Sequence, residues 1–409
     1  MNDFIINNCS NKLDNNLTHL ILKNSNSYQF HIKQDYYNKT PLIQLNSLSN
    51  HLGLNNIYVK DESNRFGLDA FKVLGSTYAL YEILKKNSKT DVFCTATDGN
   101  HGKGVAWAAK KFNKKTVVFV PKDTSINRIK AIKSFNAIVY QLDLNYEETC
   151  AYASKKCDEN GWKLVQDASW ENYEEIPSLI MSGYLTHFKE IEFPTKTNIK
   201  SKFDVIFLQC GVGSWASSCI WYYLNYYKKN RPKIVLVEPE ESCGVFESFK
   251  NGNRISPNTL FNTIMAGLNC GIPSKNAWEI IKSGCDAVIK ISDKEVKKAM
   301  RQFYNPIAND IKIIVQIEHF EAVNNLEDIL SLDHIDGSFI GPYDLSGSMG
   351  KPGRYNDTDV KDVIKKYEIT AKKYNKLIGY HVINILLYLV LFKITSSFIS
   401  ITTLSKSLK

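Results

Sequence analysis

The stretch DVFCTATDGNHGKGVAWAA, residues 91–109, joins two kinds of local pattern. Residues 91–97 form an apolar, β-branched run that is typical of a buried strand. The run that follows 104 has the composition of a helix, and three glycines lie between 99 and 104. Open parallel sheets bind ligands where strands end and helices begin, so this corner is a candidate site.

The same order of strand and helix recurs between about residues 55 and 295. Strands are predicted at 57–60, 91–97, 115–120, 137–142, 204–209 and 233–239, and helices at 126–135 and 214–227. This alternation predicts an α/β fold built around a largely parallel sheet. We expect two doubly wound α/β domains in this part of the chain.

Composition narrows the class of protein. The chain has 409 residues, of which 44% are hydrophobic and 23% charged, enough for two or three globular domains. The net charge of +9 comes from scattered lysines with no basic block among aromatics, so nucleic acid is not an expected partner. Nine cysteines form no CxxC pair, which favours a reducing, cytoplasmic location.

The C-terminal tail is unusually apolar. Residues 384–404 read NILLYLVLFKITSSFISITTL, close to the length of about 20 apolar residues that spans a bilayer. Lys393 and a cluster of serines and threonines interrupt the run. A membrane anchor is therefore an alternative that we do not favour.

A second strand-to-helix corner carries the sequence QCGVGS, residues 209–214. Glycines allow the backbone to turn sharply and its amides to approach an anion closely. The corner therefore predicts a phosphate site at Gly211, Val212, Gly213 and Ser214. A tight turn without a ligand would have the same pattern.

Lys72 begins a helical stretch between Phe71 and Val73. Apolar surroundings destabilise an ammonium ion, so we expect the pKa of Lys72 to be lowered and its amine to be available for Schiff-base chemistry. A solvated lysine is the alternative for this residue alone. Together with a phosphate loop, the lysine indicates pyridoxal 5'-phosphate, whose aldehyde needs an amine and whose phosphate needs amides.

Two aspartates follow strand-like runs and are candidates for proton transfer. Asp98 belongs to the opening corner, and Asp167 lies in VQDASWENY, residues 165–173. A positioned carboxylate can remove a Cα proton when a cofactor delocalises the resulting charge. A turn or helix-cap role is the alternative for each. Asn100 is expected to contact the cofactor ring, and His101 receives no role from the sequence.

Residues from about 30 to 314 resemble the 2,3-diaminopropionate ammonia-lyase family, pyridoxal-phosphate enzymes with a tryptophan-synthase β fold type. The matching stretches, in the order of the family, are KDESNRFGLDAFKVLGSTYA, TDGNHGKGVAWAA, VQDASWENYEEIP, QCGVGS, IVLVEP, TIMAGLNCGIPS and NPIANDIKII. The resemblance implies α,β-elimination on a small amino acid, giving pyruvate and ammonia, and a homodimer.

The same resemblance implies roles for individual residues. By it Lys72 carries the cofactor, Asn100 contacts its ring, and 211–214 hold its phosphate. Asp98 and Asp167 match the two acid-base aspartates of the family, one for each face of the substrate, so that both enantiomers react.

After 314 the family pattern stops. Residues of about 313–383 resemble instead the metal-dependent 2-oxo acid aldolases of the 4-hydroxy-2-oxoheptanedioate type, although only roughly 70 of the about 250 residues of a typical barrel are matched. Glu318 and Asp344 match the metal-binding carboxylates of that family, which suit magnesium or manganese. No segment matches its catalytic histidine and arginine.

These patterns predict four regions. A large domain is expected at 1–89 and 186–314, a small α/β domain at 90–185, a barrel-like fragment at 315–383 and the apolar tail at 384–409. Because the last strands of the lyase family are missing, we expect an exposed apolar face and an unpaired sheet edge. Two alternatives to a lyase are a divalent-metal aldolase and a fused chain that binds pyridoxal phosphate without turnover.

Overall fold

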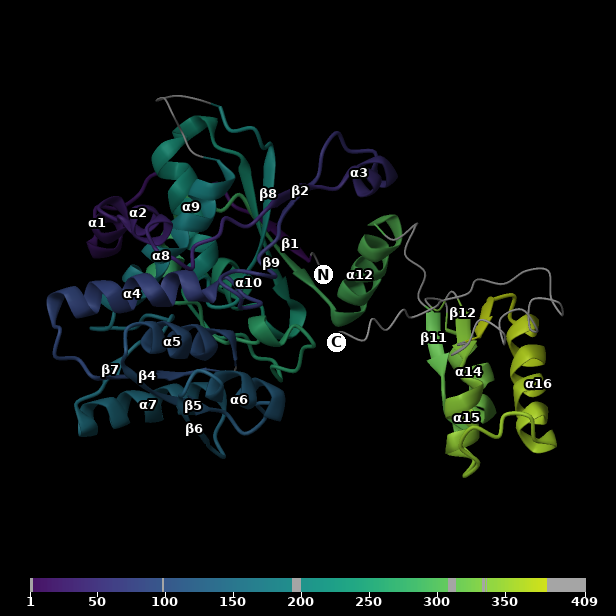
Figure 1. Ribbon diagram of the computed structural model, residues 1–409. Coiled ribbons are helices and arrows are strands. Elements are labelled where there is room, and N and C mark those ends of the chain that lie inside the picture. Colours follow the sequence, from purple (N-terminus) through teal and green to yellow (C-terminus); the bar gives the residue numbers. More distant parts are fainter. Residues whose placement is uncertain are drawn as a thin grey trace. The chain divides into compact units, whose positions relative to one another are not determined.

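The computed structural model describes residues 3–97, 99–192, 200–307, 314–332, 335 and 337–380, and side chains throughout these ranges except 301–307. The chain divides into two compact units, Met1–Arg301 and Gln302–Lys409 (Figure 1).

The first unit holds two four-stranded sheets. One has the order β1-β10-β9-β8, in which β10, β9 and β8 are parallel and β1 is antiparallel. The other has the order β6-β5-β4-β7 and is wholly parallel. A two-stranded antiparallel pair, β2 and β3, accompanies them. The strands are β1 Phe4–Ile6, β2 Leu42–Gln44, β3 Tyr58–Lys60, β4 Val92–Ala96, β5 Lys115–Val120, β6 Ile138–Gln141, β7 Lys163–Leu164, β8 Val205–Gln209, β9 Lys233–Pro239 and β10 Ala287–Ile291.

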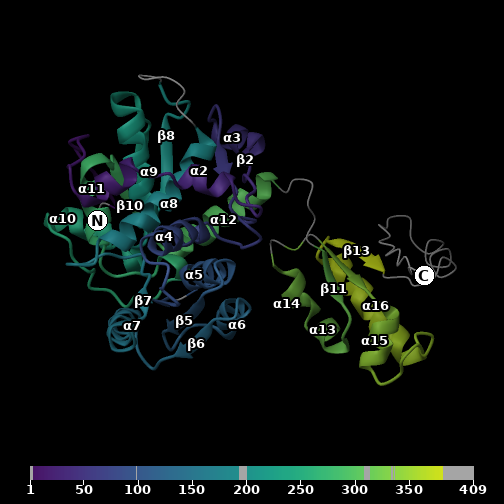
Figure 2. The ribbon, with the colours of Figure 1, turned by 60° about the vertical axis from the view of Figure 1, so that its left-hand side comes forward.

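Helices connect these strands, so the predicted α/β fold is confirmed. The α-helices of the unit are α1 Leu17–Lys23, α2 Ser27–Ile32, α3 Asn46–Leu52, α4 Lys72–Lys86, α5 Asn100–Lys111, α6 Ile126–Lys133, α7 Tyr146–Asn160, α8 Glu175–Ile191, α9 Ser214–Tyr226, α10 Gly244–Asn251, α11 Lys275–Gly284 and α12 Asp293–Ile307. Short 3-10 turns lie at Lys228–Asn230, Glu240–Ser242 and Ala266–Leu268. In both ribbon views α4 lies between the two groups of strands (Figures 1 and 2).

Two glycines let α4 and α8 touch. A Cβ atom at Gly75 would lie 2.6 Å from a methyl group of Ile180, and one at Gly183 would lie 2.5 Å from the backbone oxygen of Leu74. Larger residues at either position would push the helices apart. The close packing therefore places the first turn of α4, which begins at Lys72, directly beside α8.

A buried ion cluster fixes the loop before α4. The guanidinium of Arg65, which has no exposed surface, donates two hydrogen bonds of 2.8 and 2.7 Å to Glu190 on α8. It donates two more, each of 2.7 Å, to Glu62. Burying charges is costly unless they are fully paired, and planar Arg–carboxylate pairs give directional specificity. The cluster thus determines where the chain enters α4.

One face of the first sheet is packed and the other is open. The register aligns Leu208, Leu236, Val288 and Ile5 on the side that forms the core. The neighbouring row on the opposite side consists of Phe207, Val235, Ala287 and Ile6. Within the described residues none of this second row belongs to a core cluster, and Phe207 and Ile6 are 65% and 72% exposed. Among the described residues the expected exposed apolar face is therefore present, and β8 lies at an edge of its sheet.

We expect Phe207→Ser to reduce self-association without loss of stability, because it removes an exposed aromatic ring from the open face. The free energy of unfolding should change by no more than about 0.5 kcal/mol. Light scattering at rising protein concentration and binding of an apolar dye measure the effect. As the matched control, Leu208→Ala on the packed face should cost about 2–5 kcal/mol. Unchanged scattering by the Phe207 variant would contradict the interpretation.

The described part of the second unit contains three parallel strands in the order β11-β12-β13. Its elements are β11 Ile314–Ile317, α13 Phe320–Asn324, α14 Leu326–Leu330, β12 Gly337–Ile340, α15 Pro342–Ser348, α16 Thr358–Lys373 and β13 Leu377–Tyr380. Buried side chains from strands and helices form a core of its own, which includes Ile317, Ile340 and Tyr367. The parallel strands joined by helices agree with the strand-helix alternation expected of a barrel-like fragment. That this fragment is part of a barrel stays a prediction.

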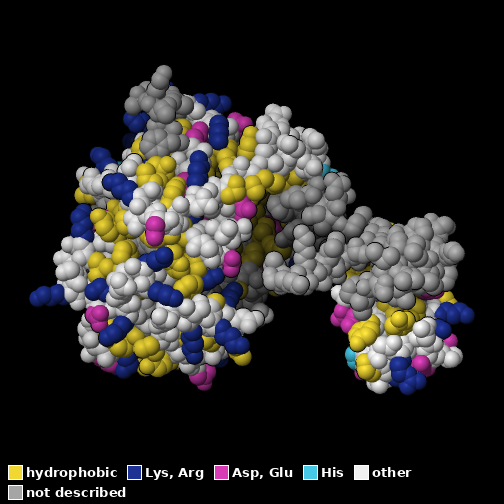
Figure 3. Space-filling view, in the orientation of Figure 1, with side chains coloured by type: hydrophobic (Ala, Val, Ile, Leu, Met, Phe, Trp, Pro, Cys, Tyr) yellow, Lys and Arg dark blue, Asp and Glu magenta, His cyan; other side chains and the backbone are white. Residues whose placement is uncertain are grey.

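No helix within the described ranges is long and apolar enough to cross a membrane. The apolar tail, residues 384–404, lies outside those ranges. Figure 3 shows hydrophobic side chains interspersed with charged ones on the visible face of the first unit.

Candidate active site

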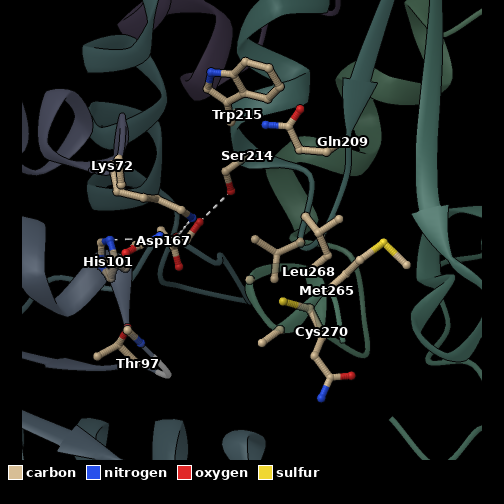
Figure 4. Close-up of a pocket in the computed structure, with 18 of the residues that line it drawn as sticks. Lys72, Thr97, His101, Asp167, Gln209, Ser214, Trp215, Met265, Leu268 and Cys270 are labelled. Carbon is tan, nitrogen blue, oxygen red and sulfur yellow. Dashed lines mark hydrogen bonds and ion pairs between the residues drawn. The ribbon is translucent and has the colours of Figure 1, made fainter. Parts of the chain in front are cut away.

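A cavity of about 460 Å³ lies in the first unit, where strands end and helices begin. The residues that line it include Lys72 at the start of α4, Asn100 at the start of α5, Asp167 and the loop 211–214. Figure 4 shows Lys72, Asp167 and Ser214 of this group. The structure therefore brings together predicted residues that are far apart in the sequence. Asp98 lies outside the described residues.

Lys72 and Asp167 form an ion pair inside this cavity. The Nζ atom of Lys72 donates a hydrogen bond of 2.5 Å to Oδ2 of Asp167, and the two side chains are 23% and 5% exposed. Burial lowers the pKa of Lys72, but the Asp167 carboxylate, together with Tyr184 and Cys270, outweighs burial and raises that pKa above its usual value. The predicted lowering is therefore wrong for this arrangement, because a charged partner stabilises the ammonium ion.

The Asp167 carboxylate is held in its ionised form. Burial raises the pKa of Asp167, yet the neighbouring His101 and the Lys72 ammonium outweigh it, and the net pKa is lowered. Ser214, the first residue of α9, donates a hydrogen bond of 2.5 Å to the backbone oxygen of Asp167. This contact joins the candidate base to the candidate phosphate loop.

His101 is a site residue that sequence reasoning left without a role. Its Nε2 atom lies 2.8 Å from the backbone oxygen of Val165, so Nε2 carries a proton there, because a carbonyl only accepts. Its Nδ1 atom faces Oδ2 of Asp167 at 3.8 Å. The sequence signal for His101 was its position in the strand-to-helix corner that follows residue 97. Its partner Asp167 is 66 residues further along the chain, so the sequence did not show the contact.

The loop 211–214 has the features of an anion site. Gly213 has a φ of +91°, and a Cβ atom there would lie 2.8 Å from Ile281, so only glycine fits. No described group accepts a hydrogen bond from the backbone N–H groups of Gly211, Val212 or Gly213. These donors stand at the N-terminus of α9, where the helix dipole favours negative charge. The loop therefore fits the phosphate group of pyridoxal phosphate.

The cavity wall contains further residues to which the sequence assigned no role. Arg128 from α6 and Tyr146 from α7 contribute to it, together with the loop 264–270. A Cβ atom at Gly99 would lie 3.3 Å from Cδ of Arg128, so the arginine side chain covers the start of α5. Only the tertiary structure brings these segments to the cavity.

Glu318 and Asp344 occupy equivalent ends of neighbouring strands in the second unit. Glu318 follows Ile317, which pairs in parallel with Ile340, and Asp344 lies in the first turn of α15 after that strand. Both side chains are exposed. The described part of the chain contains no group of three or more His, Cys, Asp or Glu side chains that could hold a metal ion. Metal binding by the pair stays a prediction.

One family model matches most of the first unit. The profile described as "Pyridoxal-phosphate dependent enzyme" matches residues 33–307, about two thirds of the chain. Fold and site thus define a pyridoxal-phosphate dependent enzyme.

Closer relatives narrow the class. The chain is 36% identical over 304 residues to the diaminopropionate ammonia-lyase of Escherichia coli K12. The alignment covers 70% of this chain and 76% of the relative. The chain is 39% identical over 313 residues to the enzyme of the same name from Salmonella typhimurium, with 71% and 76% covered. The chain belongs to the diaminopropionate ammonia-lyase family.

A solved structure agrees with this assignment. The Escherichia coli lyase in complex with an aminoacrylate-PLP azomethine reaction intermediate matches with a TM-score of 0.66 and 30% identity, covering 89% of this chain and 96% of that one.

A second profile, HpcH/HpaI aldolase/citrate lyase, matches residues 275–385 and supports the aldolase-like C-terminal region. The two profiles overlap at 275–307. In the structure α11 contributes to the core of the first unit, and β10 pairs with β9 there. The overlapping stretch up to β10 therefore belongs structurally to the lyase-like unit.

Proposed function

We propose that this protein catalyses α,β-elimination on 2,3-diaminopropionate, giving pyruvate and ammonia. The observation that carries the proposal is the convergence of Lys72, Asp167 and the glycine loop 211–214 on one cavity. The names of the relatives supply the substrate, a small amino acid with an amino group on its β carbon. Pyridoxal phosphate, when bound, supplies the electron sink that stabilises charge at Cα.

Individual residues receive roles under this proposal. Lys72 holds the cofactor through its amine, the N–H groups of 211–214 bind the phosphate, and Asn100 contacts the ring. Asp167 removes the Cα proton on one face of the substrate, since its lowered pKa keeps it ionised. Asp98 serves the other face. Asp167 becomes free to act only after the Lys72 ammonium has left it.

The assay follows each enantiomer of 2,3-diaminopropionate separately. With added pyridoxal phosphate, we expect the protein to form pyruvate from both enantiomers, with two ammonia molecules for each pyruvate. The Asp98→Asn variant should keep the cofactor link and lose elimination from one enantiomer by about 10²–10⁴-fold. Equal loss for both would contradict the assignment of faces. Cofactor absorbance without any pyruvate would instead favour a protein that binds pyridoxal phosphate without turnover.

We propose a homodimer in the cytoplasm, and a mass measurement in solution tests the dimer. The domain division at 1–89 with 186–314, 90–185 and 315–383 also stays a prediction, which limited proteolysis can test. Limited proteolysis also tests the open face of the sheet. A partner that covered the exposed Phe207 side chain would protect the first unit from cleavage. The metal aldolase alternative lacks a third described ligand beside Glu318 and Asp344.

A further inference from the structure

Tyr146, the first residue of α7, lines the cavity but has no role in the reaction as described so far. Its hydroxyl oxygen lies 3.1 Å from Nε2 of Gln166, the buried residue that precedes Asp167. A tyrosine hydroxyl can both accept and donate a hydrogen bond. The direction of this contact therefore determines what Tyr146 offers to a ligand in the cavity.

The side-chain amide of Gln166 has a fixed orientation. The backbone N–H of Ala96 donates a hydrogen bond of 3.1 Å to one end of the amide, and a backbone N–H cannot accept. That end must be the oxygen, Oε1, and the hydroxyl of Thr95 also donates to it at 3.0 Å. The nitrogen therefore faces Tyr146 and donates to the hydroxyl oxygen. It follows that Tyr146 donates its own proton to an acceptor other than Gln166.

Tyr146 and Arg128 lie at the same edge of the wholly parallel sheet. Arg128 is in the first turn of α6, which follows β5, and α7 follows β6, the parallel neighbour of β5. Both helices begin beyond the carboxyl ends of these strands, and both residues line the cavity. Among the described lining residues, Lys72 and Arg128 are the only lysine or arginine. Because Lys72 pairs with Asp167, Arg128 supplies positive charge at the edge where Tyr146 lies.

The substrate of the proposed reaction has one group that fits a directed donor near a positive charge. Its amino groups are donors when they are protonated, whereas its carboxylate only accepts. Hydrogen bonds to a charged acceptor are stronger than those between neutral groups. The phosphate of the cofactor is assigned to the loop 211–214 and the cofactor ring to Asn100. The substrate carboxylate is therefore the acceptor that matches Tyr146.

We propose that Tyr146 binds the α-carboxylate of the substrate through its hydroxyl proton, and that Gln166 is the positioning residue that directs this proton. The inference rests on the proposed function for the identity of the substrate. Whichever acceptor the proton meets before the substrate enters, a carboxylate competes for it as a charged acceptor. Tyr146 contributes to affinity for amino acids, whereas Asp167 moves the proton at Cα.

The first experiment measures binding and does not depend on elimination. Protein loaded with pyridoxal phosphate is titrated by calorimetry with alanine, which has no leaving group on its β carbon, and with ethylamine, which also lacks the carboxylate. The parent protein should bind alanine more tightly than ethylamine. Tyr146→Phe should weaken alanine binding about 10- to 100-fold and leave ethylamine binding unchanged. A parent protein that does not distinguish the two ligands, or a variant that binds alanine as the parent does, would overturn the proposal.

Gln166→Glu tests the direction of the hydrogen bond. A carboxylate at this position accepts from both Ala96 and Tyr146, so the Tyr146 proton turns toward residue 166 although the hydroxyl is retained. This variant should weaken alanine binding about as much as Tyr146→Phe, and the double variant should bind no more weakly than either single one. Additive losses would refute the positioning role of Gln166.

Tyr173→Phe is the matched control. The Tyr173 hydroxyl accepts a hydrogen bond of 2.9 Å from the backbone N–H of Gln166 and donates one of 3.0 Å to the backbone oxygen of Leu164. Tyr173 does not belong to the described lining of the cavity. Its loss should lower the melting temperature and leave alanine binding unchanged. A loss of alanine binding equal to that of Tyr146→Phe would show a merely structural effect and overturn the proposal.

Pyruvate formation from 2,3-diaminopropionate, measured in parallel, separates this inference from the proposed function. A Tyr146→Phe effect on alanine binding in a protein whose parent makes no pyruvate would refute the proposed function alone. Pyruvate formation by the parent, together with unchanged alanine binding by Tyr146→Phe, would refute the role of Tyr146 alone.

Discussion

Lys72→Ala should abolish cofactor linkage and reduce pyruvate formation by more than about 10³-fold, the scale seen when a covalent catalytic group is removed. No other lysine among the described residues lines the cavity, so no neighbour can replace the missing amine there. The substitution also leaves Asp167 buried without its ion partner, at a cost of about 3–5 kcal/mol in the free energy of unfolding. Borohydride trapping, a pyruvate assay and chemical denaturation measure the three effects.

Lys72→Arg separates chemistry from stability. Arginine retains a positive charge that can pair with Asp167, but its guanidinium does not form the link to an aldehyde. This variant should recover most of the lost stability and none of the linkage. Linkage that persists in both variants would move the reactive amine to another residue and end the proposed assignment.

Asp167→Asn should shift the reactivity of Lys72 to lower pH. With the carboxylate removed, burial becomes the dominant influence and lowers the pKa of Lys72, so the neutral amine forms at lower pH. Linkage to pyridoxal phosphate should then have a lower pH midpoint than in the parent protein. Elimination from one enantiomer should fall by about 10²–10⁴-fold.

The pH range of the ion pair follows from the signs of the two shifts. Because the pKa of Lys72 is raised in the folded protein, the ion pair stabilises the fold at pH values below the pKa that the lysine has in the unfolded chain. This stabilisation is lost only as the pH rises through the pKa of Lys72 in the folded protein. Because the pKa of Asp167 is lowered in the folded protein, the ion pair stabilises the fold at pH values above the pKa that the aspartate has in the unfolded chain. This stabilisation is lost only as the pH falls through the pKa of Asp167 in the folded protein. The stability difference between parent and Asp167→Asn should therefore be nearly constant from about pH 5 up to the pH at which Lys72 of the variant, whose pKa burial lowers, loses its proton, as denaturation at several pH values can check. A difference that varied steeply in that window would contradict the pair.

Local pattern was enough to predict much of the architecture. The runs KTVVFV and KIVLVEP became β5 and β9 with the predicted bounds, and the helix after the glycine loop starts at Ser214 as expected. These elements follow from hydrophobic periodicity and glycine placement, which act over a few residues. The three-residue strand β1 was not predicted, because so short an edge strand has almost no periodic signal.

The sequence by itself determined the fold class, the lysine that begins α4, the glycine loop at α9 and the family of the chain. The tertiary structure alone decided how these groups act on one another. Lys72 and Asp167 are 95 residues apart, and their contact reverses the expected pKa shift of the lysine. Charge pairing, the approach of His101 and the orientation of the Tyr146 hydroxyl by Gln166 depend on distances between segments, which no local pattern contains.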